Sequence, residues 1–143
     1  MEGVFVLIAE DDADDRFLLQ SAFYENNFHD KLQFAENGIE LMAQLNKLIS
    51  LGITGNLPSF ILLDLNMPKK DGREALKDIR SNPLLKSIPV VIFSTTNNET
   101  ERKRCYDLGA NSYFTKPASF DGLIKTIAAI RSQWVGFNCN IIV

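Results

Sequence analysis

Polar side chains follow several short apolar runs of this sequence, at the point where each run ends. The runs are rich in branched residues, which is typical of strands covered on both faces of a sheet. The polar residues that follow them are Glu10, Asp11, Asp12, Asp64, Ser94 and Lys116. Carboxylates can hold a cation, and a hydroxyl and an ammonium can stabilise the oxygens of a phosphoryl group during its transfer. Either chemistry requires a fold that gathers these residues.

The apolar runs alternate with segments of helical periodicity. The runs lie at Val4–Ala9, Leu32–Ala35, Ile61–Leu63, Pro89–Phe93 and Ser112–Phe114. Leu41, Leu45 and Leu48 mark the stripe of one helix between them, and Ser119 stands as the N-cap of the last helix. Strictly alternating strands and helices require parallel pairing with right-handed crossovers. The sequence therefore predicts an α/β fold, with a doubly wound five-stranded parallel sheet and helices on both faces.

In an open sheet of this kind, ligands bind at the carboxyl ends of the strands, where the strand order reverses. In the flavodoxin-like order 2-1-3-4-5 the first and third strands are neighbours at that point, so Asp11, Asp12 and Asp64 would converge. Carboxylates in a partly dry crevice repel one another, so one of them takes a proton or a cation lies among them. A shallow, wet site of hard oxygen ligands suits Mg²⁺.

Asp64 is the candidate for covalent chemistry. It closes an otherwise apolar strand, where burial of a carboxylate costs free energy. Beside Mg²⁺ and the ammonium of Lys116, its carboxylate could attack a phosphoryl group and form an aspartyl phosphate. Structural explanations stay open for single residues: acids such as Asp14 and Asp15 stabilise a helix N-terminus, and a hydroxyl such as Ser94 is a common turn residue.

Length and composition limit the classes of function. The 143 residues correspond to one domain, and 45% hydrophobic with 23% charged residues is ordinary for a globular protein. The net charge of −3 makes nucleic acid and anionic membranes poor candidate partners. We find neither an apolar run of membrane-spanning length nor an export signal at the start. The two cysteines are too few for a secreted disulfide scaffold, so we expect a cytoplasmic protein.

Several motifs together resemble the receiver domain of two-component response regulators. They are the acids Glu10–Asp12 after the first strand, the segment Asp64–Gly72 (DLNMPKKDG), the pair Ser94–Thr95 and the segment Tyr113–Pro117 (YFTKP). The resemblance runs from about residue 4 to residue 134, nearly the whole chain. The segments Asp14–Arg16 and Asp71–Glu74 are most similar to stand-alone regulators that pair with bacterial phytochrome kinases.

The resemblance implies a role for each matched residue of the acidic site. Asp64 is the phosphoacceptor, and Lys116 is the lysine that neutralises charge during the transfer. Mg²⁺ is held by Asp11 and Asp12 together with Asp64, with Asp12 the closer ligand of the first two. The backbone carbonyl of Asn66 completes the protein's share of the ligands.

The resemblance also implies a signalling cycle. A partner histidine kinase or phosphotransfer protein donates the phosphoryl group, and Ser94 moves toward it. Tyr113 then turns inward, which reshapes the face of the fourth helix, fifth strand and fifth helix. Water later hydrolyses the acyl phosphate at a rate influenced by Asn66 and Thr96. The protein would catalyse only its own phosphorylation and dephosphorylation, and would signal by protein contact without an effector domain; a second copy of the chain is another candidate partner.

The expected domain organisation is a receiver at residues 1–134 and a C-terminal tail at residues 135–143. The segment 50–58 is longer than in compact members of the family and could contact a specific partner. The last three residues are apolar and could dock on a neighbour as an added strand, although a frayed terminus is the simpler explanation.

Other functions fit the residues less well. Phosphatases of the haloacid-dehalogenase kind also use an Asp nucleophile, but they place a second Asp two residues on, where this chain has Asn66. A flavodoxin-like carrier must cradle the phosphate of FMN, which the acids Glu10–Asp12 would repel. The remaining alternative is a receiver-like module that binds proteins without phosphorylation, and it is disfavoured because every site residue is in place.

Overall fold

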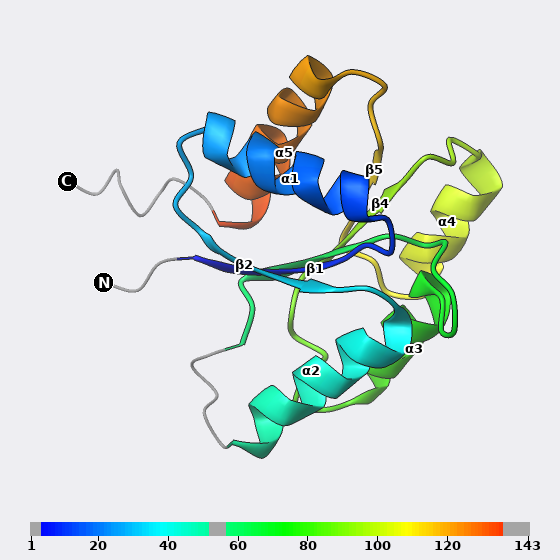
Figure 1. Cartoon of the computed structure of the whole chain (residues 1–143). Coiled ribbons are helices and arrows are strands. Elements are labelled where there is room, and N and C mark those ends of the chain that lie inside the picture. Colours follow the sequence, from blue (N-terminus) through cyan, green and yellow to red (C-terminus); the bar gives the residue numbers. More distant parts are fainter. Residues whose placement is uncertain (1–3, 52–56, 136–143) are drawn as a thin grey trace.

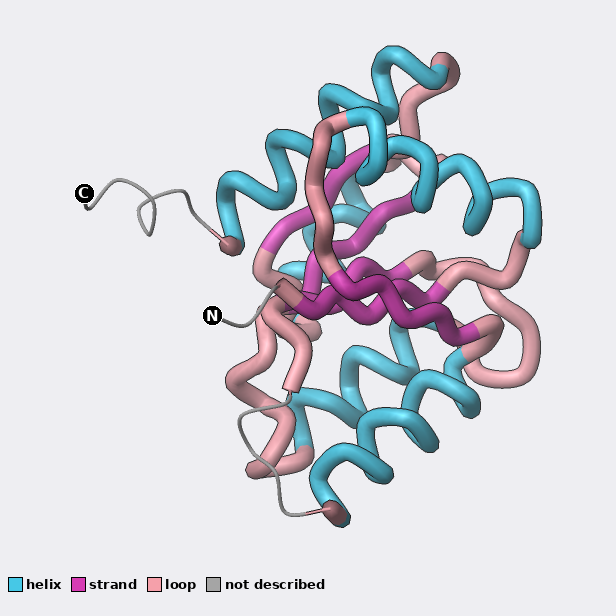
Figure 2. The backbone as a smooth tube through the Cα atoms, turned by 60° about the vertical axis from the view of Figure 1, so that its left-hand side comes forward, coloured by secondary structure: helices cyan, strands magenta, loops and turns pink. Residues whose placement is uncertain are grey.

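Five parallel strands form one sheet between two layers of helices in the computed structural model, which describes residues 4–51 and 57–135 (Figures 1 and 2). The strands are β1 (Phe5–Ala9), β2 (Lys31–Ala35), β3 (Phe60–Leu63), β4 (Val90–Ser94) and β5 (Ser112–Thr115). Their order is β2-β1-β3-β4-β5, and every pair is parallel. This order confirms the predicted doubly wound, flavodoxin-like fold.

A helix follows each strand. The helices are α1 (Ala13–Glu25), α2 (Gly38–Ser50), α3 (Gly72–Ser81), α4 (Glu99–Asp107) and α5 (Phe120–Trp134). Figure 1 shows α1 and α5 on one face of the sheet and α2 and α3 on the other, and the buried side chains place α4 with α2 and α3. The sheet is therefore covered on both faces, which leaves the ends of the strands as its accessible edges.

The apolar runs of the strands are continuous because both faces of the sheet are buried. In β3, Phe60 and Leu62 pack with α1 and α5, while Ile61 and Leu63 pack with α2, α3 and α4. All four side chains are at most 1% exposed. No helix within the described parts of the chain has the length and apolar character needed to cross a bilayer.

Short polar residues begin the helices and a glycine ends one of them. Ser119 caps α5, where its hydroxyl accepts a hydrogen bond of 3.0 Å from the backbone N–H of Gly122, as predicted. Gly109 follows α4 with φ of 110°, a left-handed conformation that glycine adopts without strain and that stops the helix. These local signals set where each strand–helix loop begins and ends.

The described chain ends one residue after α5. Trp134 is the last residue of α5, and its indole N–H donates a hydrogen bond of 3.2 Å to the hydroxyl of Ser112 in β5. Residues 136–143, most of the predicted tail, and residues 52–56, within the predicted long segment, lie outside the described residues. The tail and the partner contact of segment 50–58 therefore stay predictions.

Candidate functional site

The carboxyl ends of β1, β3 and β5 carry the candidate site, and backbone hydrogen bonds fix the residue that follows each of these strands. The Glu10 N–H donates to the Ala35 carbonyl at 2.9 Å, and the Asp64 N–H donates to the Ala9 carbonyl at 3.1 Å. The Lys116 N–H donates to the carbonyl of Ser94 at 2.8 Å. Each residue thus extends the sheet by one step, and its side chain starts from a fixed position at the same edge.

Three carboxylates gather at this edge. Oxygens of Glu10, Asp11 and Asp64 all lie within 4.8 Å of one another. Glu10 and Asp64 are buried, whereas Asp11 is exposed, so the group is open to solvent on one side. Carboxylate oxygens that are close together and partly wet are the ligands that a hard divalent cation prefers, and this group fits one.

The gathered acids differ from the expected set, which contained Asp12 in place of Glu10. Asp12 is the N-cap of α1, where its carboxylate accepts a hydrogen bond of 2.9 Å from the backbone N–H of Asp15. The side chain of Glu10 is buried beneath the edge, with only 2% of the residue exposed. The sequence motif contains Glu10, but the resemblance assigns metal binding to the two acids that follow it. Its place directly after the last strand residue, Ala9, is the signal that could have identified it.

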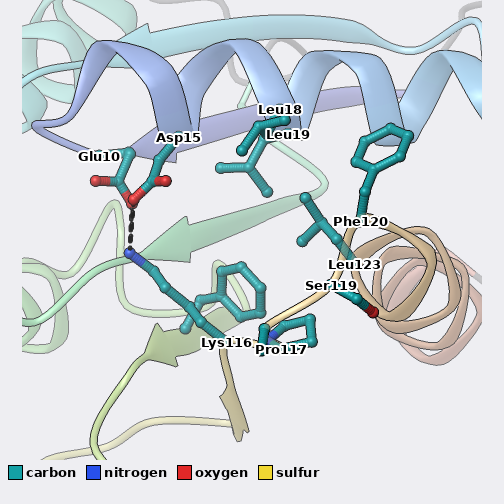
Figure 3. A pocket seen from close by; sticks show the side chains of 11 residues that line it. Glu10, Asp15, Leu18, Leu19, Lys116, Pro117, Ser119, Phe120 and Leu123 are labelled. Atoms are coloured by element: carbon teal, nitrogen blue, oxygen red, sulfur yellow. Dashed lines mark hydrogen bonds and ion pairs between the residues drawn. The ribbon is translucent and has the colours of Figure 1, made fainter.

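Lys116 reaches several of these carboxylates. Its Nζ lies 2.7 Å from Glu10 Oε1, 3.5 Å from Asp64 Oδ2 and 3.6 Å from Asp15 Oδ2. Figure 3 shows the lysine side chain extending from β5 toward Glu10 and Asp15. The expected approach of Lys116 to Asp64 is present, and the shorter contact is the one with Glu10.

Burial changes the protonation of the buried acids. It raises the pKa of Glu10 to about 7, although the hydrogen bond and positive charge of Lys116 oppose this rise. Burial also raises the pKa of Asp64 above its ordinary value, again against the effect of Lys116. Burial alone would lower the pKa of the Lys116 ammonium, but the neighbouring carboxylates outweigh it and the pKa is raised. Lys116 therefore stays positively charged, and it lies beside two acids, Glu10 and Asp64, that lose their protons less readily than ordinary carboxyl groups.

The loop after β3 packs tightly around Asp64. The backbone N–H of Asn66 donates to Asp64 Oδ1 at 3.4 Å, a long hydrogen bond. The N–H of Gly72 donates to the Leu65 carbonyl at 2.9 Å, and a Cβ on Gly72 would collide with the backbone of Asp64 and Leu65. The start of α3 therefore lies directly against the main chain of Asp64. The role of the Asn66 carbonyl as a metal ligand stays a prediction.

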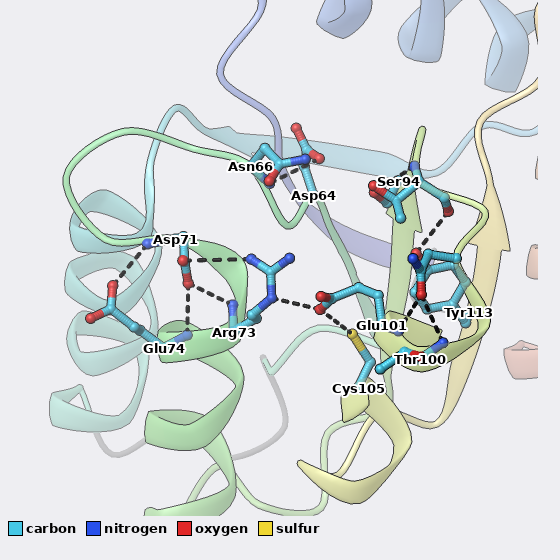
Figure 4. A network of polar contacts seen from close by, with 12 residues as sticks. Asp64, Asn66, Asp71, Arg73, Glu74, Ser94, Thr100, Glu101, Cys105 and Tyr113 are labelled. Carbon is cyan, nitrogen blue, oxygen red and sulfur yellow. Dashed lines mark hydrogen bonds and ion pairs between the residues drawn. The ribbon is translucent and has the colours of Figure 1, made fainter. Parts of the chain in front are cut away.

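Ser94 and Tyr113, both labelled in Figure 4, form a second group with Thr96 at the end of β4. Ser94 is fully buried, and its Oγ accepts a hydrogen bond of 3.2 Å from the Thr96 N–H. The Tyr113 hydroxyl donates to the Thr96 carbonyl at 2.9 Å, and the residue is 3% exposed. The guanidinium of Arg102 in α4 lies 5.1 Å from the centroid of the tyrosine ring. Tyr113 is thus turned inward, which is the position that the resemblance to receiver domains implies for the phosphorylated protein.

The family model for the response regulator receiver domain matches residues 6–128 of this chain. The chain belongs to the response regulator receiver family. It is similar to the response regulator Rcp1 of Synechocystis sp., with 39% identity over 132 residues that cover 91% of this chain and 88% of Rcp1. The structure is similar to that of the phosphorylated cyanobacterial phytochrome response regulator RcpA, with a TM-score of 0.83 and 37% identity over 94% of this chain and 95% of RcpA.

The structure is also similar to the Mn²⁺-bound form of Rcp1, with a TM-score of 0.80 and 36% identity over 94% of this chain and 96% of Rcp1. The resemblance to receiver domains is thereby confirmed. The chain matches the signalling domains of two-component systems, and not the phosphatases or flavin carriers that share some of its features. The acidic group of Glu10, Asp11 and Asp64 fits the pocket in which receiver domains bind a divalent metal.

Proposed function

We propose that this receiver domain accepts a phosphoryl group on Asp64 from a phosphohistidine of a partner protein. The observation that carries the proposal is the position of Asp64: a buried carboxylate at the end of β3, beside the acidic group and 3.5 Å from the Lys116 ammonium. A nucleophile, a cation site and a fixed positive charge within a few ångströms are what transfer of a phosphoryl group requires.

The proposed step is a displacement at phosphorus. A carboxylate oxygen of Asp64 forms a bond to the phosphorus atom as the bond between phosphorus and the donor histidine nitrogen breaks. The electron pair of the broken bond stays on the histidine nitrogen. The imidazole leaves as the neutral ring, with a proton on one of its two nitrogens. Lys116 compensates negative charge that spreads over the phosphoryl oxygens. Mg²⁺, held by Glu10 or Asp12 with Asp11 and Asp64, would supply the remaining positive charge.

The positions of the two side chains favour Glu10 over Asp12 as the metal-binding acid. Glu10 lies within the group of converging oxygens, whereas the carboxylate of Asp12 accepts a hydrogen bond from the first turn of α1. A ligand set of Glu10, Asp11, Asp64 and the Asn66 carbonyl is therefore our revised proposal. Carboxylate and carbonyl oxygens favour Mg²⁺ over softer metals.

Phosphorylation would signal through the face formed by α4, β5 and α5. Ser94 would move its hydroxyl toward the phosphoryl oxygens, and the contacts of Tyr113 with Thr96 and Arg102 would respond because they adjoin the same loop. Water would later hydrolyse the acyl phosphate, with Asn66 and Thr96 influencing the rate. The chain would catalyse only its own phosphorylation and dephosphorylation.

The proposed partner is a sensor histidine kinase or a phosphotransfer protein. RcpA is a phytochrome response regulator, and its similarity to this chain supports a phytochrome kinase as the donor. A homodimer is a further proposed assembly. The net charge of −3 favours neither nucleic acid nor membrane as a partner, and we propose a cytoplasmic location. The receiver would span residues 1–134, with residues 135–143 as its tail.

A small phosphodonor tests the proposal without the kinase. Acetyl phosphate with Mg²⁺ should add one phosphoryl group, about 80 Da by intact mass spectrometry, and Asp64→Asn should abolish the addition. Ser94→Ala is the comparison variant, because it should retain labelling at a changed rate. Equal labelling of the Asp64→Asn protein would contradict the proposal. A wild-type protein that takes up no phosphoryl group would favour binding without phosphorylation.

A further inference from the structure

A carboxylate outside the acidic group also reaches the ammonium of Lys116. Asp15 Oδ2 lies 3.6 Å from Lys116 Nζ, nearly the same separation as the 3.5 Å between Nζ and Asp64 Oδ2. Glu10 and Asp64 follow strands, whereas Asp15 belongs to the first turn of α1 and approaches from the helix layer. Figure 3 shows the carboxylates of Asp15 and Glu10 close together, facing the ammonium. Lys116 is therefore shared between the site and α1.

Local structure fixes the position of Asp15. Its backbone N–H donates to the carboxylate of Asp12 at 2.9 Å, so the N-cap sets the first turn from which the Asp15 side chain projects. The Asp15 side chain is 44% exposed and that of Lys116 is 15% exposed, and both line a pocket of about 110 Å³. A carboxylate in contact with water thus acts on a sheltered ammonium, where solvent screens the interaction less than in bulk water.

Asp14 provides a comparison within the same turn. Both acids lie near the positive end of the α1 dipole, which each would stabilise in the same way. Asp14 is exposed and has no ion pair within the parts of the chain that the structure describes, whereas Asp15 contacts Lys116. Helix stabilisation accounts for both acids equally, and it does not account for the contact of Asp15 with the site.

We propose that Asp15 is a positioning residue that holds the Lys116 ammonium toward α1 and slows the phosphorylation of Asp64. This inference rests on the proposed function. During transfer, negative charge spreads over the phosphoryl oxygens, and Lys116 compensates it. The Asp15 carboxylate competes with those oxygens for the ammonium. It also places a negative charge beside the path of an anionic phosphodonor. Both effects have the same sign, so Asp15 lowers the rate.

The rate of phosphorylation by acetyl phosphate tests this role, measured by intact mass spectrometry at saturating Mg²⁺. Asp15→Asn should raise the second-order rate constant by about 3- to 10-fold, because it removes one charge and leaves the backbone cap intact. The increase should shrink at high ionic strength, since the carboxylate is partly exposed. Asp15→Glu should restore a rate close to that of the wild type. Asp14→Asn, the matched control, should change the rate by less than about twofold.

The variants also separate positioning from a structural role. Both Asn variants remove one acid from the first turn, and Asp15→Asn also removes the ion pair with Lys116, so both should lower the unfolding temperature. Only Asp15→Asn should change the rate. If the wild-type protein is labelled, three results would overturn this inference alone. They are equal phosphorylation rates for Asp15→Asn and Asp14→Asn, a rate for Asp15→Asn below that of the wild type, and a rate for Asp15→Glu equal to that of Asp15→Asn. A wild-type protein that takes up no phosphoryl group would overturn the proposed function together with this inference.

Discussion

At the scale of single residues, Glu10 links the acidic site to pH. Burial raises its pKa to about 7, so in the folded protein it keeps a proton over a range in which an ordinary glutamate, with a pKa of 4.5, has lost it. The unfolded chain binds fewer protons in that range, and the contribution of Glu10 to stability is lost as the pH rises from about 4.5 through about 7. At the proposed metal site, a cation would compete with this proton for the Glu10 carboxylate.

The first prediction concerns this competition. Mg²⁺ affinity should rise about tenfold between about pH 6 and about pH 8, because binding must displace the proton of Glu10 at the lower pH. Isothermal titration calorimetry at several pH values measures the affinity directly. Glu10→Gln should bind Mg²⁺ more weakly and with less dependence on pH, whereas Asp12→Asn should retain the pH dependence of the wild type. An affinity that stays constant over this range would contradict the role of Glu10.

At the scale of elements, an ion pair joins the α3 helix to the α4 helix (Figure 4). Arg73 Nε in the first turn of α3 donates to Glu101 Oε2 in α4 at 2.6 Å, and the side chains are 22% and 18% exposed. The preceding residue, Gly72, packs against the main chain of Asp64. The next residue of α4, Arg102, lies over the ring of Tyr113. This pair therefore links α3, which begins against Asp64, to α4, which contacts the tyrosine.

Loss of that ion pair should cost stability. Glu101→Gln should lower the free energy of unfolding by about 1 kcal/mol, because a charged, largely sheltered hydrogen bond becomes a neutral one. Arg73 lowers the pKa of Glu101, so this contribution is complete above about pH 4.5 and is lost as the pH falls through the lower pKa of the folded state. Urea denaturation at neutral pH measures the change. Asp78→Asn, which removes the more exposed pair with Lys70, is the control and should have the smaller effect. Equal effects would contradict the prediction.

The elements themselves could be predicted from the sequence, but the side chains that meet at their ends could not all be assigned. A strand that is buried on both faces of the sheet needs a continuous apolar run, and a helix that packs on the sheet needs an apolar stripe. Both patterns are local, so they can be seen in the sequence of each element. The choice among Glu10, Asp11 and Asp12 depends on the residue at which β1 ends and on the residue that caps α1. These residues are Ala9 and Asp12, and a shift of one residue turns a site acid into a helix cap.

At the scale of the whole molecule, the sheet topology connects the acidic edge to the α4–β5–α5 face. The strand order places β1 between β2 and β3, so Glu10 and Asp64 meet although 54 positions separate them in the sequence. Lys116 follows β5 at the far side of the sheet and reaches Glu10 across it. The inward position of Tyr113 could not be predicted, because it depends on long-range contacts with Thr96 and Arg102.

Chemical trapping of the acyl phosphate tests the central claim most directly. The protein is phosphorylated with acetyl phosphate and Mg²⁺ and then treated with borohydride, which reduces an acyl phosphate to an alcohol and leaves free carboxylates unchanged. Peptide mass spectrometry should then find homoserine at position 64, in proportion to the phosphoryl group incorporated. Homoserine at another aspartate, or phosphate on Ser94 or another hydroxyl with position 64 unchanged, would contradict the account.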